Sequence, residues 1–515
     1  MPPHSLSALD AGLIAIYVTA IIGLGLVLSR RRASAQEFFL ASHAAPWPVI
    51  GLSLVASNIS PTALIGITGS AYAIGISVYN YEWMAAVILA LFALVYLPVV
   101  LKAGVYTMPE FLERRYDGRA RLWFAGLTLL LNMLLDAAGA LYGGGLLLRL
   151  LAPQLSLFEA VALLAVLAGV YAASGGLRAV MYTEAVQAVI VLLAALTLAW
   201  FAIGAAGGWE AVLSRVDPAK LSLIRPAHDP YMPWTGLVFG APILGFYFWC
   251  TNQFMVQRML AAKSLRDGQK GALFAGLLKL TTLFVIVLPG SAAILLYPRL
   301  DHGDEAYPRL LFDLIPSGLL GVILAAFVGA LMAQLSATYN SAATLIAMDF
   351  IRRARPEMDG GALVRWGRLA TLGCMAASIL WAPQIARFPS LWEYLQGVLA
   401  YVTPPVVALF GVGLLWPRAN AQGAFAAIVC GGLTGAALFV GVVSGAWPVQ
   451  FLHVAVIVFL VSVAALVAGS LATAPRPAAE AVAIPSLGGE PPARSVLLLA
   501  GALMAVTALI VVRFR

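Results

Sequence analysis

The stretch "ASNISPTALIG", residues 56–66, decides how this sequence is expected to fold. It lies inside residues 47–75, a run without charged residues that is long enough to cross a bilayer. Its centre holds five polar or helix-breaking residues: Ser57, Asn58, Ser60, Pro61 and Thr62. Pro61 has no N–H and frees a backbone carbonyl, which needs a partner at bilayer depth. We therefore predict a membrane helix that unwinds here beside a cavity holding an ion or a solute. The alternative is a proline kink covered by neighbouring helices.

The composition indicates a polytopic helical membrane protein. Of the 515 residues, 62% are hydrophobic and 10% are charged, and the mean hydropathy is +0.93. A soluble protein of this length would need more charged residues to cover its surface. The net charge of +8 is not taken as a sign of a nucleic-acid partner. The positions of the basic residues in the loops instead indicate the orientation of the helices in the membrane. Three cysteines without metal-ligand spacing are expected to be small buried residues, and no cofactor is predicted: Cys250, Cys374 and Cys430.

Apolar runs longer than about 17 residues predict about fourteen transmembrane helices, with the bilayer as their surroundings. Their ranges are 9–29, 46–75, 79–101, 120–150, 155–173, 177–206, 232–255, 268–297, 317–348, 364–383, 391–416, 420–443, 449–471 and 494–513. With the N-terminus outside, the inside loops hold 21 of the 31 Lys and Arg residues and nine lie at the outer face. Because basic residues favour the cytoplasmic side, we predict a multi-pass protein of the plasma (cell inner) membrane with its N-terminus outside.

Four ionisable residues lie deep in the predicted helices: Glu82, Asp136, Glu184 and Lys279. A charge at the centre of a membrane helix costs about 2.5–3.5 kcal/mol, so such residues face an aqueous cavity or each other. Internal ion pairs that only orient helices are the alternative to a functional cavity. A second break is predicted in "APILGFYFWCTNQF", residues 241–254. Breaks in the second and seventh helices indicate two inverted repeats of five helices.

Several stretches resemble the solute:sodium symporter family, in its sodium/glucose cotransporter branch. They are "ASNISPTALIGITGSAYAIGISVYNYEW", "YTMPEFLERRY", "FWCTNQFMVQRMLAAKSLRDGQKGALFAGLLKL", "GALMAQLSATYNSAATLIAMDF" and "YLQGVLAYVTPPVVALFGVGLLWPR", in order between residues 50 and 420. The resemblance implies an all-α, LeuT-like 5+5 inverted-repeat core with broken helices. The expected parts are an extra N-terminal helix with its inside loop (1–45), the ten-helix core (46–418), two more helices (419–471), a flexible cytoplasmic linker (472–493) and a last helix (494–515).

The resemblance also implies a substrate pocket. Residues matching the family's substrate positions are Asn58, Glu82, Asp136, Trp249, Lys279 and Gln396, and those matching its gates are Tyr81, Phe248 and Trp392. Four positions depart from the sugar-transporter pattern: Ala63, Ala85, Asp136 and Gly245. Losing hydrogen-bond partners for hydroxyl groups weakens discrimination, so a hexose is one candidate substrate among small polar solutes. We also expect Asp136 to pair with Lys279 across the cavity; a cationic substrate held by Asp136 and Glu82 is the alternative.

The family's sodium site maps onto backbone carbonyls and two side chains. Its positions are Ala56, Ile59 and Ala330 for carbonyls, Ala333 and Gln334 where relatives carry hydroxyls, and Glu184 nearby. Sodium requires a shell of several oxygens, and Ala333 supplies none from its side chain. A Gln334 amide oxygen or the Ser336 hydroxyl could replace a lost ligand. The sequence thus leaves open whether sodium or a proton on Glu184 or Asp136 drives transport.

The leading hypothesis is a secondary active transporter that moves a small polar solute with a cation, sodium by family resemblance, through alternating access. Proton-coupled or uncoupled transport by the same fold is the alternative, and a solute sensor is a third class. An enzyme is not expected, because no nucleophile–base pair or metal cluster is visible in the sequence. The sequence does not predict an oligomeric state.

Overall fold

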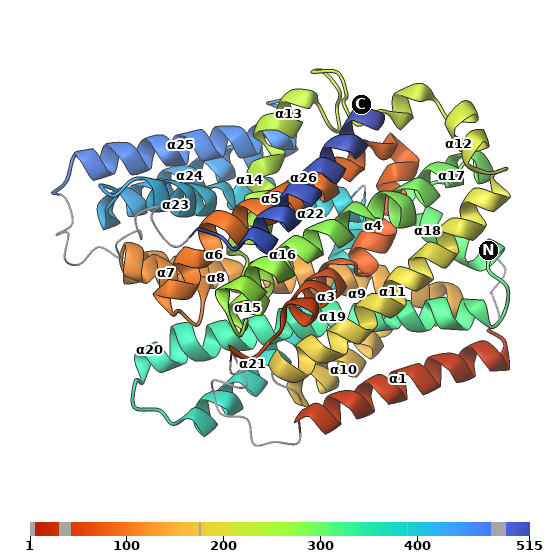
Figure 1. The fold of residues 1–515 in the computed structure, drawn as a ribbon, viewed down its shortest axis with the longest axis horizontal. Helices are drawn as coiled ribbons and strands as arrows, with labels where there is room; N and C mark the ends of the chain where they lie inside the picture. Colours follow the sequence, from red (N-terminus) through yellow and green to blue (C-terminus); the bar gives the residue numbers. More distant parts are fainter. Residues whose placement is uncertain (1–5, 30–42, 175–176, 389, 475–490) are drawn as a thin grey trace.

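Helices form every regular element in the part of the chain that the computed structural model describes, residues 6–29, 43–174, 177–388, 390–474 and 491–515 (Figure 1). In these ranges 11 helices are long and apolar enough to cross a membrane, or up to 13 if each of two bent pairs is one span. A shorter apolar helix, Leu157–Gly169, lies where the fifth crossing is predicted. The predicted all-α membrane fold is therefore confirmed.

The helices of the first part of the chain are α1 (Ala8–Ser29), α3 (Trp47–Asn58), α4 (Pro61–Ile74), η2 (Ile76–Tyr79), α5 (Asn80–Leu91), η3 (Phe92–Tyr96), α6 (Leu97–Ala103), α7 (Met108–Arg115), α8 (Gly118–Leu131), η4 (Asn132–Ala137), α9 (Ala138–Leu151), α10 (Leu157–Ser174), α11 (Leu177–Ala205), α12 (Trp209–Arg215) and η5 (Pro218–Leu221). The central ones are α13 (Trp234–Phe239), α14 (Ala241–Phe246), η6 (Tyr247–Thr251), α15 (Gln253–Leu260), α16 (Leu265–Leu280), η7 (Leu283–Val287), α17 (Leu288–Leu296), η8 (Gly303–Glu305) and α18 (Ala306–Leu314). The last are α19 (Leu319–Leu345), η9 (Ile346–Ile351), α20 (Arg352–Ala354), α21 (Gly360–Trp381), η10 (Ala382–Arg387), α22 (Leu391–Val402), α23 (Pro404–Leu415), α24 (Ala421–Val443), α25 (Phe451–Leu471) and α26 (Arg494–Arg513).

The predicted break in the second membrane helix is present. Helix α3 ends at Asn58, α4 begins at Pro61, and the two are bent by 60°. Ser60 is extended (φ −121°, ψ 174°), which places Pro61 at the first position of the new helix, where its missing N–H leaves no gap in the ladder. The unwound residues thus separate two half-helices whose ends face the interior of the molecule.

Two further breaks lie in the core. Helix α14 passes into the π-helical turn η6 and stops at Thr251; Asn252 is extended and caps α15 by accepting a hydrogen bond from the Phe254 N–H. This is the break predicted within residues 241–254. The predicted range 391–416, expected as one helix, instead contains α22 and α23, bent by 52° at Thr403–Pro404. The Pro404–Pro405 pair explains the difference, because two successive residues without an N–H cannot continue a helix.

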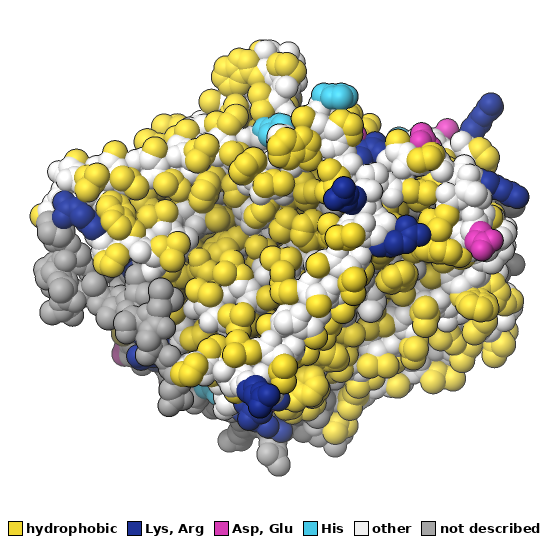
Figure 2. Space-filling model, turned by 45° about the horizontal axis from the view of Figure 1, so that its top comes forward, with side chains coloured by type: hydrophobic (Ala, Val, Ile, Leu, Met, Phe, Trp, Pro, Cys, Tyr) yellow, Lys and Arg dark blue, Asp and Glu magenta, His cyan; other side chains and the backbone are white. Residues whose placement is uncertain are grey.

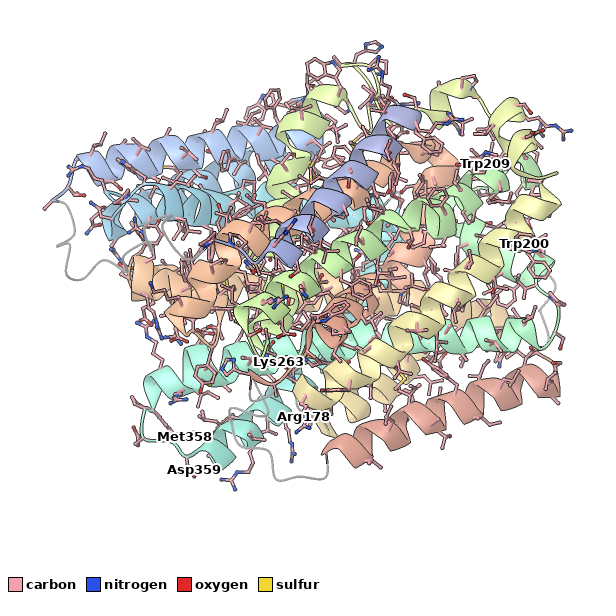
Figure 3. The ribbon with its side chains drawn as sticks, viewed as in Figure 1. Arg178, Trp200, Trp209, Lys263, Met358 and Asp359 are labelled. Atoms are coloured by element: carbon pink, nitrogen blue, oxygen red, sulfur yellow. The ribbon has the colours of Figure 1, made fainter. Side chains whose placement is uncertain are left out.

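Loops that the sequence assigns to the same side of the membrane lie together. Figure 3 shows Arg178, Lys263 and Asp359 at one end of the molecule and Trp209 at the other. Asp10, near the start of α1, contacts residues 317–321, while Phe514 packs on the Trp209 ring at 6.4 Å between ring centroids. Both described ends of the chain therefore approach loops that the sequence assigns to the outer side.

The surface has the character expected in lipid. Figure 2 shows a face covered mostly by hydrophobic side chains, with few charged groups. Large apolar side chains stand out from several helices, among them Trp200 with 78% of its surface exposed and Leu415 with 71%. Contiguous exposed apolar surface of this kind marks a membrane or protein interface in a folded protein. On helices of this length and hydropathy, it faces the acyl chains.

Candidate functional site

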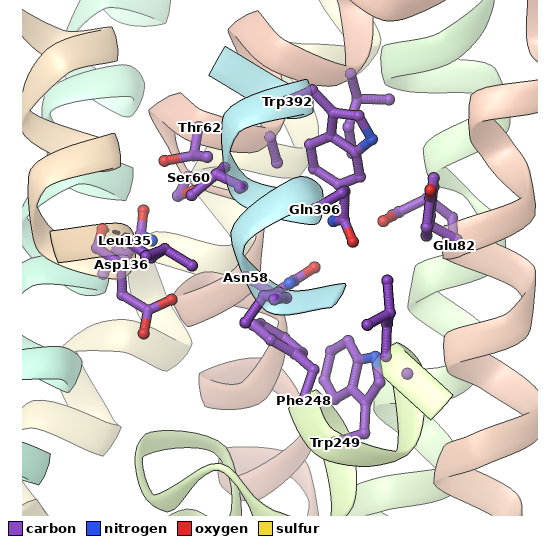
Figure 4. A pocket seen from close by; sticks show the side chains of 18 of the residues that line it. Asn58, Ser60, Thr62, Glu82, Leu135, Asp136, Phe248, Trp249, Trp392 and Gln396 are labelled. Carbon is purple, nitrogen blue, oxygen red and sulfur yellow. Dashed lines mark hydrogen bonds between the residues drawn. The ribbon is translucent and has the colours of Figure 1, made fainter. Parts of the chain in front are cut away.

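A cavity of about 100 Å³ lies at the break between α3 and α4 (Figure 4). Nine residues singled out from the sequence line it: Asn58, Tyr81, Glu82, Asp136, Phe248, Trp249, Gln334, Trp392 and Gln396. They come from six elements, α3, α5, η4, η6, α19 and α22, and residues of α4 and α14 complete the wall. Two π-helical turns, η4 and η6, carry Asp136, Phe248 and Trp249, and such turns commonly occur at functional sites in helices. The polar residues at the α3–α4 break therefore line this cavity.

One wall of the cavity is built on a buried ion pair. The Lys279 ammonium, 1% exposed on α16, contacts the Glu82 carboxylate of α5 and donates a hydrogen bond to the Asn58 side-chain oxygen. The Lys279 nitrogen also lies 5.9 Å from the centroid of the Trp249 ring. Lys279 therefore lies behind the cavity wall, while its partners Glu82 and Asn58 line the cavity itself.

The predicted pairing of Asp136 with Lys279 is wrong. Lys279 takes Glu82 as its partner, and Asp136 lies across the cavity from Glu82 (Figure 4). Among the described residues, no Lys, Arg or His nitrogen lies within 4.0 Å of the Asp136 carboxylate, and the Asn252 side chain is its polar neighbour. The backbone carbonyl of Asp136 accepts a hydrogen bond of 3.1 Å from Gln334 Nε2. The cavity consequently has one neutralised acid and one acid without a counter-charge.

Aromatic rings close the cavity at two places. Tyr81 and Trp392 meet edge to face with 5.5 Å between ring centroids. On another wall, Phe248 contacts Trp249 at 5.1 Å and Phe254 at 5.7 Å in the same geometry. The Tyr81–Trp392 contact joins α5 and α22, which are far apart in the sequence, whereas the Phe248 contacts stay within η6 and the adjoining α15.

Two of the predicted sodium-site positions, Ala56 and Ala333, lie together among apolar groups. Ala56, Ala188 and Ala333 form a small buried cluster, and Ile59 and Ala330 are also buried. Gln334 lies on the cavity wall, where its nitrogen binds the Asp136 carbonyl and its oxygen has no hydrogen-bond partner. The Ser336 hydroxyl donates to the Ala333 carbonyl at 3.0 Å. In this conformation neither side chain replaces a lost hydroxyl ligand.

Glu184 is held by a partner that the sequence reading missed. Arg258, on α15, donates to both Glu184 carboxylate oxygens, at 3.1 and 2.7 Å, and to the Ser53 hydroxyl at 2.9 Å. Both charged side chains are fully buried. Arg258 lies between the predicted helices 232–255 and 268–297, in a region expected to be an inside loop. Its apolar neighbours in "FMVQRML" are the sequence signal that it is buried. Glu184 lies one helical turn from Ala188 and so remains beside the sodium-site positions.

Comparisons with known proteins agree with this arrangement. A sequence model of the sodium:solute symporter family matches residues 38–431. The chain is 32% identical to sodium/glucose cotransporter 1 of Oryctolagus cuniculus, over 92% of this chain and 80% of that protein. It is 34% identical to the sodium/glucose cotransporter of Vibrio parahaemolyticus, over 83% of this chain and 84% of that protein. A solved structure of a sodium-coupled sialic acid symporter, in a substrate-bound outward-open state, matches in fold with a TM-score of 0.81 at 20% identity, over 91% of this chain and 98% of that one.

These matches confirm the LeuT-like fold and the family that the motifs resemble. The curated relatives are transporters and not enzymes. They are multi-pass membrane proteins of one family, and the family model covers most of this chain. The chain belongs to the sodium:solute symporter family.

Proposed function

We propose that this protein is a secondary active transporter that carries a small polar solute through the cavity at the α3–α4 break by alternating access. The observation that carries the proposal is the Glu82–Lys279 pair, which is buried at membrane depth and yet presented to a cavity. Keeping two charges at this depth is costly unless they are used or fully satisfied. The ten-helix core, residues 46–418, is the proposed transport unit, in the cell membrane with the N-terminus outside.

Glu82, Asn58 and Gln396 are proposed to bind solute hydroxyl groups. The carboxylate accepts hydrogen bonds, while the two amides both donate and accept them. Trp249 offers a flat apolar face on which a sugar ring can stack. Two relatives are named for glucose, and a sugar is therefore one candidate solute. Ala63, Ala85 and Gly245 reduce the number of polar partners, which favours a solute with fewer or differently placed hydroxyl groups than glucose.

Tyr81 and Trp392 are proposed as the outer gate and Phe248 as the inner gate. Each lines the cavity and also packs against a ring from another element. A ring that can leave such a contact opens a path on one side only. Alternating access requires that the two ring contacts are not both broken at the same time.

Sodium is proposed as the coupling ion, by family membership, with the carbonyls of Ala56, Ile59 and Ala330 as ligands. The apolar cluster at Ala333 favours a second candidate, a proton carried by Asp136, because fewer oxygens remain to replace the water around sodium. Glu184 is less suited to carry the proton, since Arg258 holds both of its oxygens.

Uptake into proteoliposomes tests the function and the coupling ion together. A panel of labelled sugars, polyols and amino compounds is offered under an inward sodium gradient or an equal proton gradient. Stimulation by sodium alone supports the family ion, and stimulation by protons alone supports Asp136. The double substitution Ala333→Ser with Gln334→Ser is expected to raise sodium dependence. No uptake of any solute under either gradient would contradict the proposal.

A further inference from the structure

The cavity lining contains an acid, Asp136, that no charged side chain of the described residues pairs with. Its described lining contains two acids, Glu82 and Asp136, and no Lys, Arg or His. Glu82 is neutralised from behind by Lys279. Asp136 lies on the opposite side of the cavity from Glu82 (Figure 4), and Thr62 of α4 also lines the cavity. A carboxylate away from bulk water is stabilised by an opposite charge or by several donors. Asp136 has the Asn252 side chain as a polar neighbour but no charged partner among the described residues.

The wall around Asp136 also has spare hydrogen-bond acceptors. Gln334 is 6% exposed, its nitrogen is bound to the Asp136 backbone carbonyl, and its Oε1 has no partner. Thr62 is 7% exposed, and its hydroxyl has no hydrogen-bond partner either. Buried polar atoms in folded proteins are nearly all satisfied, so unpartnered ones lining a cavity indicate a ligand group. Two of the three groups, Asp136 and the Gln334 oxygen, can only accept hydrogen bonds.

We propose, on the basis of the transport function proposed above, that Asp136 and Gln334 form a subsite for the protonated amino group of a polyhydroxylated solute. A primary ammonium group has one positive charge and three N–H donors and no acceptor. It matches the charge of the Asp136 carboxylate and supplies a donor to the Gln334 oxygen and to the Thr62 oxygen. The hydroxyl groups of the same solute would reach Glu82 and Gln396 on the opposite wall. The substrate class is an amino sugar or an amino polyol.

The two ends of the cavity thus select for different properties. The Glu82–Lys279 side is neutral overall and recognises hydroxyl groups through directional hydrogen bonds. The Asp136 side recognises charge. Hydrogen bonds to a charged group are about twice as strong as neutral ones, so an amine should bind more tightly than the matched alcohol or amide.

The test uses matched ligands on the purified full-length protein, measured by isothermal titration calorimetry. The ligands are D-glucosamine, D-glucose and N-acetyl-D-glucosamine, and on a smaller scaffold 2-amino-1,3-propanediol and glycerol. The amines are expected to bind roughly tenfold more tightly than their neutral counterparts, or better, at a pH where they are protonated. Asp136→Asn keeps the shape and removes the charge, and is expected to reduce that ratio to about one.

Two controls separate this inference from the transport proposal. Glu210→Gln removes one exposed acidic charge on α12, far from the cavity lining, and should leave the ratio unchanged. Glu82→Gln should weaken all ligands of both kinds, and a lack of any effect counts against the transport site itself. Equal affinity for amines and neutral ligands in the wild type would overturn the subsite, as would a ratio that Asp136→Asn does not alter. If Asp136→Asn removes the response to a proton or sodium gradient but not the ratio, Asp136 binds the coupling cation and the subsite is wrong.

Discussion

Glu82 and Lys279 show how a single contact decides both folding and recognition. The ammonium is buried, so it depends on the carboxylate and on Asn58 for its interactions. Removing one partner of a buried pair typically costs about 3–5 kcal/mol, because a charge is left without compensation. Replacing both partners by apolar or neutral groups is far less damaging. This asymmetry allows stability and transport to be measured separately.

Glu82→Gln is expected to lower the stability of the protein by about 3 kcal/mol or more and to abolish solute uptake. The double variant Glu82→Gln with Lys279→Met should regain most of the stability, because no buried charge remains, and should still fail to transport. Thermal unfolding in detergent and uptake in proteoliposomes measure the two effects. A double variant that transports at the wild-type rate would show that the pair is only structural.

The sequence predicted which charges lie at membrane depth but not how they pair. Glu82, Asp136, Glu184 and Lys279 were each identified from an apolar context alone. Lys279 could equally have met Glu82 or Asp136, since the choice depends on the rotation of α16 about its own axis, which no local pattern specifies. Arg258 was missed for a related reason: it lies near a predicted helix end, and only the packing of α15 against α3 and α19, with the Glu184 partner from α11, shows that it is buried. Pairing is a property of the packed helices.

At the scale of elements, breaks were predictable where polar residues accompany the proline. Pro61 stands among serines, an asparagine and a threonine, and the α3–α4 break was expected. Pro404 and Pro405 stand among apolar residues, and the apolarity of the run concealed the α22–α23 bend. A backbone break at membrane depth needs partners for its freed carbonyls, and these come from neighbouring elements that the local sequence does not reveal.

The contact between α1 and α19 makes a prediction at this scale. Asp10 accepts hydrogen bonds from the N–H groups of Gly318 and Gly321, both at 2.7 Å, and from the Ser317 hydroxyl at 3.0 Å. It therefore caps the first turn of α19 from another helix, where a negative charge is also favourable. Asp10→Ala should lower stability by about 1–2 kcal/mol, as loss of a helix cap does. Thermal unfolding checks this, with the exposed Leu9→Ala as the control; equal unfolding temperatures for the two variants would contradict the capping role.

The turn η8 supplies a pH-dependent contact to the gate helix α22. Asp304 accepts a hydrogen bond of 3.0 Å from the Leu391 N–H at the start of α22, and its other oxygen is buried without a partner. Burial raises the pKa of the Asp304 carboxyl to about 6, against the opposing effects of the Leu391 hydrogen bond and of His302. The Tyr142 phenol lies near enough to this carboxyl for the two to interact electrostatically. Because the folded-state pKa is raised, the folded protein binds this proton more tightly, and stability is lost as pH rises through about 6.

Asp304→Asn should remove this part of the pH dependence. At pH 7 the variant lacks the buried charge and should unfold at a higher temperature relative to the wild type than it does at pH 5, where Asp304 is protonated. The comparison is made by thermal unfolding at both pH values, with His302→Gln as the control for histidine titration. A difference between variant and wild type that stays constant from pH 5 to pH 7 would refute the assignment.

At the scale of the whole molecule, hydropathy and charge alone predicted the fold class, because the bilayer restricts a chain to helices that satisfy their own backbone. The all-helical architecture follows from this constraint. The number of spans was predicted less closely, since fourteen were expected and the described residues form 11 long apolar helices, or up to 13 spans with the bent pairs. The ion selectivity does not follow from it. Ala333 and Gln334 stand at the positions that the family resemblance assigns to sodium binding. Their effect depends on side-chain directions, with Gln334 turned to the cavity and Ala333 to Ala56 and Ala188.

The central claim is that a polar solute crosses the membrane through the cavity at the α3–α4 break. The most direct measurement is uptake by proteoliposomes of the tightest-binding solute of the panel, comparing the wild type with Glu82→Gln plus Lys279→Met, which should be equally well folded. We expect saturable uptake by the wild type and, for the double variant, uptake at the level of empty liposomes. Saturable uptake of equal rate by both proteins would contradict it.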